Sequence, residues 1–198
     1  AWQKLESAAR KFDPDHPLVA FSRIKSAAAL YDLGRNLEAK AALEAGLAGT
    51  PLDDPTYLTS RAQGVALRGT ILAQAGEAES AIEALRQGYK DYLTGFANVA
   101  QADRKRGTYM AKSNLEFSLS QVLLRLSEVD DALAFQKISL ETREGAVGPN
   151  DPDTIGSYYG YAGTLRRAGR LEEAERIARI AVDRAVDHLD PSHTSYAR

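Results

Sequence analysis

Few side chains in this sequence stand in a pattern that could carry out chemistry. The histidines are His16, His188 and His193; no two have the spacing of a zinc protease, and cysteine is absent. The carboxylate pairs Asp130-Asp131 and Glu172-Glu173 could serve acid–base chemistry, but both fall where helices are expected to begin, and there they complement the helix dipole. We therefore expect no catalytic residue, no metal site and no cofactor.

Three glycines, Gly156, Gly160 and Gly163, could suggest a nucleotide site. No strand signal precedes them and no Gly-Lys-Ser/Thr follows, so they do not form a phosphate-binding loop. They lie in a predicted helix, where each costs roughly 1 kcal/mol relative to alanine. Close helix packing is the favoured compensation, and a dent left in a binding surface is the alternative.

The composition excludes several classes of protein. The 198 residues include 25 Lys+Arg and 27 Asp+Glu, and this formal net charge of -2 argues against direct binding of nucleic acid. No apolar run approaches the roughly 20 residues that span a bilayer, so we expect no membrane insertion. The lack of cysteine fits a cytoplasmic location, and the alanine and arginine content suggests a bacterial source. The sequence starts as if within a helix, which predicts an excerpt of a longer protein.

Proline and glycine divide the chain into helical segments. Asp54-Pro55 and Asp151-Pro152 place a capping aspartate before a proline at the first helical position. Leu33-Gly34-Arg35, Ala75-Gly76-Glu77 and Ala168-Gly169-Arg170 predict tight turns with a left-handed glycine, and Ser127 is a fourth, weaker instance. Gly34 and Gly76 are 42 residues apart, as are Ser127 and Gly169, which predicts stacked repeats.

Apolar residues recur at helical spacing, and no convincing strand pattern is found, so the predicted fold class is all-α. The expected helices are 1–12, 17–33, 36–48, 55–75, 77–95, 107–126, 128–144, 153–168, 170–188 and 192–198. The middle unit carries about nine extra residues, which we place in a solvated, mobile loop at 97–106. A binding role for this loop is the less favoured alternative.

The sequence resembles the tetratricopeptide repeat, in particular the 42-residue variety of kinesin light chains and many bacterial proteins. Pro14-Asp15-His16-Pro17 and Gly148-Pro149-Asn150-Asp151-Pro152 resemble the junction motif of that variety, and the stretch 165–174 resembles its helix-turn-helix core. Gly69 and Ala162 match the small residue where the paired helices approach. The resemblance implies one right-handed superhelical solenoid of antiparallel hairpins. Its parts are a tail helix in 1–14, hairpins in 15–50, 51–96, 107–147 and 148–190, and the start of a further repeat in 191–198.

The resemblance also implies a concave groove lined by the first helix of each hairpin. Counting back from each turn predicts that the groove-facing residues include Lys25, Gln63, Gln74, Asn114, Gln121, Arg125, Tyr159, Arg166 and Arg167. Arginine suits carboxylates and the amides suit a peptide backbone, so we expect a protein or peptide partner, extended and acidic, with an apolar residue near Tyr159. The alternative is that these arginines are solvated or paired with neighbouring glutamates.

The function predicted from this resemblance is a protein-interaction scaffold. One alternative is a sensory or regulatory domain of a bacterial transcription regulator or kinase. Another is self-association into a homo-oligomer, because incomplete terminal hairpins would expose apolar faces. An enzyme on a helical scaffold is the least favoured alternative.

Overall fold

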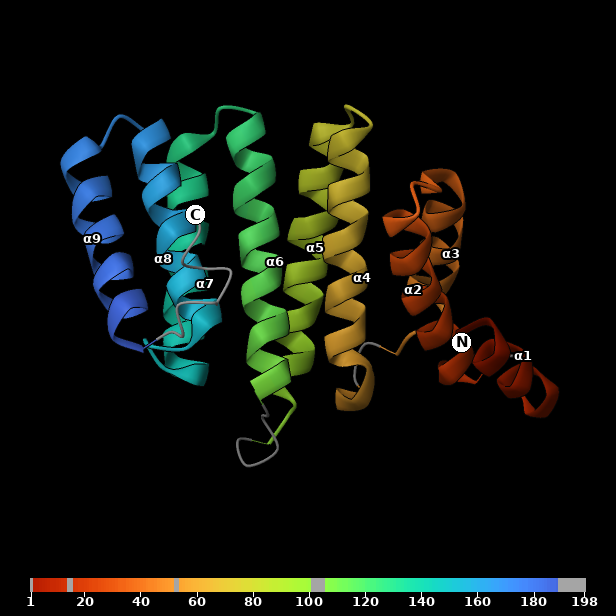
Figure 1. Cartoon of the computed structure of the whole chain (residues 1–198). Coiled ribbons are helices and arrows are strands. Elements are labelled where there is room, and N and C mark those ends of the chain that lie inside the picture. Colours follow the sequence, from red (N-terminus) through yellow and green to blue (C-terminus); the bar gives the residue numbers. More distant parts are fainter. Residues whose placement is uncertain (1, 14–15, 52–53, 101–105, 189–198) are drawn as a thin grey trace.

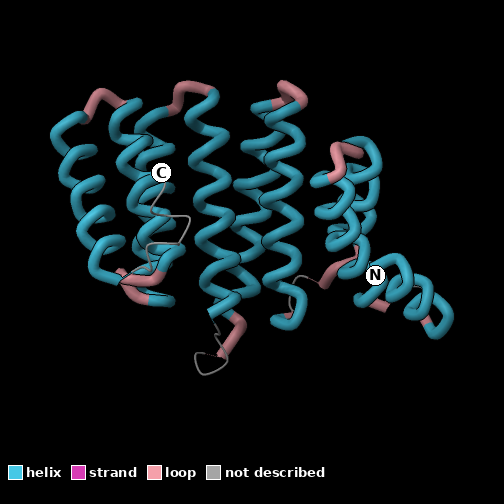
Figure 2. Tube along the Cα trace, viewed as in Figure 1, coloured by secondary structure: helices cyan, strands magenta, loops and turns pink. Residues whose placement is uncertain are grey.

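The computed structural model describes residues 2–13, 16–51, 54–100 and 106–188, and in these residues every regular element is an α-helix (Figures 1 and 2). The helices are α1 (Trp2–Phe12), α2 (Pro17–Asp32), α3 (Asn36–Ala48), α4 (Pro55–Gln74), α5 (Ala78–Ala97), α6 (Arg106–Arg125), α7 (Val129–Val147), α8 (Pro152–Arg167) and α9 (Leu171–His188). The predicted helices that fall in the described residues are all present. The predicted helix at 192–198 lies outside the described residues.

Three helices begin with a capping side chain and proline, a combination that the sequence predicted at Asp54-Pro55 and Asp151-Pro152. His16, Asp54 and Asp151 each accept a hydrogen bond from the backbone N–H two residues later, at 3.1, 2.8 and 3.0 Å. The proline that follows each cap lacks an N–H, so it leaves no donor unsatisfied in the first turn. The start of α2, α4 and α8 is therefore set by local sequence.

The four tight turns share one backbone geometry. Gly34, Gly76 and Gly169 have positive φ values of 74°, 82° and 74°, and Ser127 has 64°. In each turn the N–H of the next residue bonds to a carbonyl five residues back, at 2.9–3.0 Å, as in a Schellman ending. The predicted left-handed turns are confirmed, including the serine turn.

The helices pair into hairpins that stack side by side (Figures 1 and 2). Helix α2 packs on α3, α4 on α5, α6 on α7, and α8 on α9, while α1 packs on α2 at one end. In Figure 1 the second helices α5 and α7 lie behind the first helices α4 and α8. Together they form a solenoid of helix hairpins, as predicted.

Two glycines allow the helices to approach closely. A Cβ built on Gly69 of α4 would lie 2.5 Å from Leu85, and one built on Gly88 of α5 would lie 2.2 Å from Val65. Neither position has room for a side chain unless its neighbour moves. The expected role of Gly69 in close packing is confirmed.

The hydrophobic core falls into two main clusters. The larger one runs from α2 to α6 and contains Leu43, Leu85 and Leu119; the smaller one joins α7, α8 and α9 and contains Leu165 and Ala181. Helix α6 packs closely on α4 and α7 but makes little direct contact with α8. Polar side chains occupy much of the region between α6, α7 and α8.

The connection between α5 and α6 differs from the predicted solvated loop at Val99, while its neighbours in the described residues are exposed. Val99 is only 4% exposed and belongs to the larger core cluster. Arg106, the first residue of α6, pairs with Asp151 at 3.1 Å and with Asp153 at 3.6 Å. Residues 101–105 lie outside the described residues. In the part of the chain that is described, no helix is long and apolar enough to cross a membrane.

Candidate binding face on the first helices

The predicted residues of the first two hairpins lie together on α2 and α4. The Lys25 amine donates a hydrogen bond to the Gln63 carbonyl oxygen at 2.6 Å, and the Gln74 amide donates to the Tyr31 hydroxyl at 2.7 Å. These contacts bridge two first helices that are about 40 residues apart in sequence, as expected for positions that face one groove. A cavity of about 280 Å³ lies between the two helices, lined by Ile24, Lys25, Ala28, Tyr31, Asp32, Gln63 and Leu67.

The predicted residues of α6 and α8 have mixed surroundings. Asn114 is half-buried, and its amide oxygen accepts a hydrogen bond from Arg143 at 2.7 Å. This oxygen is therefore already engaged within the fold. Gln121 is half-buried, and its side chain has no hydrogen bond in the described residues. Tyr159 is also half-buried, packed against Ile155 and Ala185.

The three predicted arginines are exposed and have no partner. Arg125, Arg166 and Arg167 make no side-chain hydrogen bond or ion pair in the described part of the chain. Nearly all other arginines with described side chains are engaged, Arg176 being a further exception. The sequence leaves two alternatives to a binding role for these arginines, solvation and pairing with neighbouring glutamates. The pairing is not seen in the described residues.

The glycines of α8 do not share one role. A Cβ built on Gly160 would lie 2.9 Å from the Gln136 amide, so close packing explains this glycine. Gly156 and Gly163 have no atom within 4 Å of such a Cβ. The favoured interpretation of close packing is wrong for these two positions, because this face of α8 is open.

A half-buried arginine that the sequence reasoning missed connects α6, α7 and α8. Arg143 of α7 donates to the hydroxyls of Ser113 and Ser157 at 2.7 and 2.8 Å, to Asn114, and to the Asp153 carbonyl at 3.2 Å. Burial lowers the pKa of the Arg143 guanidinium, and the nearby carboxylate of Asp153 opposes this effect. The backbones of α6 and α8 make little direct contact, and the Arg143 guanidinium links the two helices by hydrogen bonds to both.

A buried glutamate forms a second polar cluster beneath the face. Glu116 is fully buried and accepts hydrogen bonds from the Tyr89 hydroxyl at 2.7 Å, from the Thr142 hydroxyl at 3.1 Å and from Lys112. Burial, together with the bond to Glu116, raises the pKa of Tyr89. The spacing of Lys112 and Glu116, four residues apart, was the available sequence signal. It indicates a pair, but it does not distinguish a buried pair from an exposed one.

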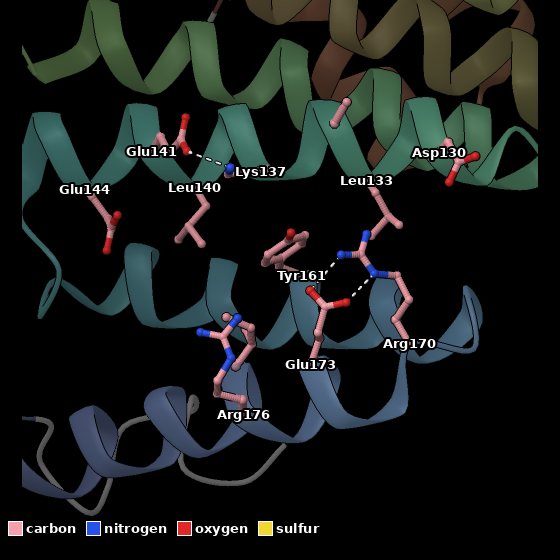
Figure 3. A pocket seen from close by; sticks show the side chains of 12 residues that line it. Asp130, Leu133, Lys137, Leu140, Glu141, Glu144, Tyr161, Arg170, Glu173 and Arg176 are labelled. Atoms are coloured by element: carbon pink, nitrogen blue, oxygen red, sulfur yellow. Dashed lines mark hydrogen bonds and ion pairs between the residues drawn. The ribbon is translucent and has the colours of Figure 1, made fainter.

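A further hollow of about 530 Å³ lies away from the first-helix face, between α7 and α9 (Figure 3). At one end Arg170 binds both carboxylate oxygens of Glu173 at 2.5 and 2.7 Å, beside Tyr161. Along its rim Lys137 lies 3.7 Å from Glu141. Most of its charges are thus neutralised locally. Its apolar lining comes from Leu133, Ala134, Leu140 and Ile177.

The described residues contain no group of three or more His, Asp or Glu side chains placed to hold a metal ion. The predicted acidic pairs lie in the first turns of α7 and α9, as expected for residues that complement a helix dipole. His188 is the last residue of α9, where a cation is favoured. His193 lies outside the described residues.

Comparison with known proteins agrees with this architecture. The tetratricopeptide repeat family model matches residues 109–185. No curated protein matches the chain. Solved structures with a similar fold include BtubC (BKLC) from P. vanneervenii, with a TM-score of 0.71 and 16% identity over 98% of this chain and 75% of that chain. Another is a Podosopora anserina putative kinesin light chain with nearly identical TPR-like repeats, with a TM-score of 0.66 and 15% identity over 96% of this chain and 86% of that chain.

A variant of the same Podosopora anserina repeats gives the same result, with a TM-score of 0.67, 15% identity, and coverage of 94% of this chain and 84% of that chain. At these identities the likeness establishes the fold. The left-handed turns, the capped first helices and the match at residues 109–185 all agree with it. Residues 109–185 therefore match the tetratricopeptide repeat family, and the described residues share the fold of kinesin-light-chain-like repeat proteins.

Proposed function

We propose that this chain is an interaction scaffold that binds an extended, acidic segment of another protein along the first-helix face, meaning the exposed side of α2, α4, α6 and α8. Tetratricopeptide repeats generally mediate interactions between proteins, which supports this proposal. The observation that carries the proposal is that Arg125, Arg166 and Arg167, at the ends of α6 and α8, are exposed and have no partner among the described residues.

Unpaired arginines favour an acidic partner for a physical reason. Each guanidinium presents a planar fork of N–H donors that matches the two oxygens of a carboxylate. Arg125 ends α6, while Arg166 and Arg167 end α8, so the three charges lie in the last turns of two first helices. A cation in the last turn also complements the helix dipole. Stabilisation of the helix alone would not require two adjacent arginines, Arg166 and Arg167, at the end of α8.

The open glycines support a binding surface on α8. Because Gly156 and Gly163 have free space where a side chain would stand, a partner can approach the helix backbone there. Gln121 of α6 adds a half-buried amide that can donate to and accept from a peptide backbone. These features suit a segment held by main-chain contacts and carboxylates.

Proteins of this fold are typically non-catalytic scaffolds, and we propose no enzymatic role for this chain. The polar clusters around Glu116 and Arg143 are internally hydrogen-bonded. They are accounted for by contacts between helices.

The proposal is tested by affinity capture from a lysate of the source organism. The bait is the wild-type chain, beside a variant in which Arg125, Arg166 and Arg167 are changed to alanine. A matched control changes three exposed arginines of the second helices, Arg86→Ala, Arg176→Ala and Arg179→Ala. We expect a partner that is retained by wild type and control and lost by the first variant, with all three baits giving the same circular dichroism. Equal retention by all three would contradict the proposed face.

Self-association is a second candidate, favoured by the outer side of α9. Val182 and Val186 are 47% and 59% exposed. The equivalent of Val182 in the preceding hairpin is Leu140 of α7, because each stands 13 residues after the residue that closes its turn. Leu140 is only 6% exposed and packs in the cluster that joins α7, α8 and α9. Sedimentation velocity over a range of concentrations tests this candidate. A dimer that a Val182→Glu variant abolishes would support it, and a monomer at all concentrations would exclude it.

A further inference from the structure

The cavity between α2 and α4 has charges of opposite sign at its two ends. Lys25 and Asp32 both line it and are seven residues apart on α2. Seven residues make about two helical turns, which separates the Cα atoms by roughly 10 Å along the axis. Between the two charges the lining is apolar or small, with Ile24, Ala28 and Leu67.

The charge of Lys25 is not balanced within the described residues. Its amine donates to the neutral Gln63 and lies 5.5 Å from the centre of the Phe21 ring, and no carboxylate lies within ion-pair distance. Burial lowers its pKa. A carboxylate brought to this end of the cavity would therefore restore an interaction that the fold itself does not supply.

The charge of Asp32 is also unbalanced, and it is poorly placed for the helix. Its exposed side chain makes no hydrogen bond or ion pair in the described residues. It is the last residue of α2, where a negative charge opposes the helix dipole. Local helix stability therefore does not explain an aspartate at this position.

We propose that this cavity takes one apolar side chain of the bound segment and selects for an acidic residue on one side of it and a basic residue on the other. The acidic residue would face Lys25 and the basic residue would face Asp32. An extended chain rises about 3.3 Å per residue, so the two charged residues stand about three positions apart. This inference rests on the proposed function, because it assigns part of the partner's sequence to one end of the same face.

The absence of cysteine from the sequence permits a direct test by disulfide tethering. Ala28→Cys places a single thiol between the two charges, at an exposed position that lines the cavity. Three blocked hexapeptides carry one cysteine between two charged residues that stand three positions apart, and they differ only in that pair: one acid and one base, two acids, or two bases. The yield of mixed disulfide at a fixed concentration of reductant reports how well each peptide fits. The mixed-charge peptide is supplied as an equal mixture of both orders of acid and base, so the comparison makes no assumption about the direction in which the peptide runs.

We expect the mixed-charge peptide to be favoured about fivefold over the other two, the size of effect that one partly exposed ion pair gives. In the Ala28→Cys background, Asp32→Lys should shift the preference to the doubly acidic peptide. Lys25→Glu should shift it to the doubly basic peptide. A control thiol at the exposed Ser80 of α5 should show a preference that neither substitution changes.

Equal yields for the three peptides, or a preference that survives both charge substitutions, would overturn the inference. Circular dichroism of each variant establishes that it is folded. The inference and the proposed function can fail separately. If no charge preference is found but partner capture still depends on Arg125, Arg166 and Arg167, only this subsite is removed. Capture that ignores those arginines would remove the proposed face itself.

Discussion

Replacing Ser127 by glycine should stabilise the protein. Ser127 closes α6 with φ 64°, at a turn where the equivalent residues are Gly34, Gly76 and Gly169. Its backbone makes the same pair of hydrogen bonds as theirs, so glycine would keep the turn unchanged. The serine side chain itself makes no hydrogen bond in the described residues. Its Cβ therefore contributes strain without a compensating contact.

The size of the effect follows from two opposing terms. A left-handed conformation costs an L-residue with a Cβ about 1–2 kcal/mol. Glycine avoids this cost but loses roughly 0.5–1 kcal/mol through the greater freedom of its unfolded chain. The net gain for Ser127→Gly is therefore about 0.5–1 kcal/mol, which corresponds to a rise in Tm of about 1–4 °C for a chain of this size.

Thermal unfolding followed by circular dichroism, with urea titration of the same samples, measures this gain. Ser127→Ala is the matched control, because it removes the hydroxyl but keeps the Cβ that causes the strain. We expect no stabilisation from alanine. A glycine variant less stable than wild type, or an equal gain from alanine, would refute the explanation from backbone strain.

Four further variants separate packing, charge and titration effects, each followed by urea unfolding. Gly163→Ala should stabilise by about 0.5–1 kcal/mol through helix propensity, since its surroundings are open; a loss would show that the site is crowded. Gly88→Ala should destabilise by about 1–2 kcal/mol because its Cβ would overlap Val65; a gain would contradict the close approach. Glu116→Gln should cost about 1.5–3 kcal/mol, since charged hydrogen bonds at a fully buried position are weakened; an effect under about 0.5 kcal/mol would contradict this. Burial raises the pKa of Tyr92, so the unfolded chain loses this proton first and stability falls above about pH 10; Tyr92→Phe should make that fall shallower by up to about 1.4 kcal/mol per pH unit, and an unchanged slope would contradict it.

Local signals explain why the helices could be predicted from sequence. Asp54-Pro55 and Asp151-Pro152 fix helix starts through bonds within two residues, and Gly34 or Gly169 fix turns through their own backbone conformation. These features need no knowledge of tertiary packing. The ends of α5 and α7 depend less on such signals. Those helices run two and three residues beyond their predicted ends.

The register of the first helices also carried information about the face. Counting from the turns placed Lys25 and Gln63 on one surface, and their hydrogen bond joins α2 to α4. The environment of α8 could not be obtained in this way. Whether Gly156 faces open space or a neighbouring helix depends on the tilt of α8 against α6 and α7. A single sequence does not encode that tilt in any local pattern.

The fully buried Glu116 and the half-buried Arg143 were missed for a related reason. Arg143 and Glu116 occupy helical positions that would suit solvent-exposed charges equally well. Their partners lie far along the chain: Ser113 is 30 residues from Arg143, and Tyr89 is 27 residues from Glu116. Only the packing of α5, α6, α7 and α8 together shows that these charges are enclosed.

The measurement that tests the central claim most directly is site-specific photocrosslinking to the partner captured by the wild-type chain. A photoreactive residue is placed at Gln121 or Gly163, on the first-helix face, and in separate variants at Lys137 or Glu175, on the second helices. If the partner lies along the first helices, crosslinks form from Gln121 and Gly163 and not from the other two positions. Crosslinks from Lys137 and Glu175 alone would show that the partner binds the opposite side of the solenoid.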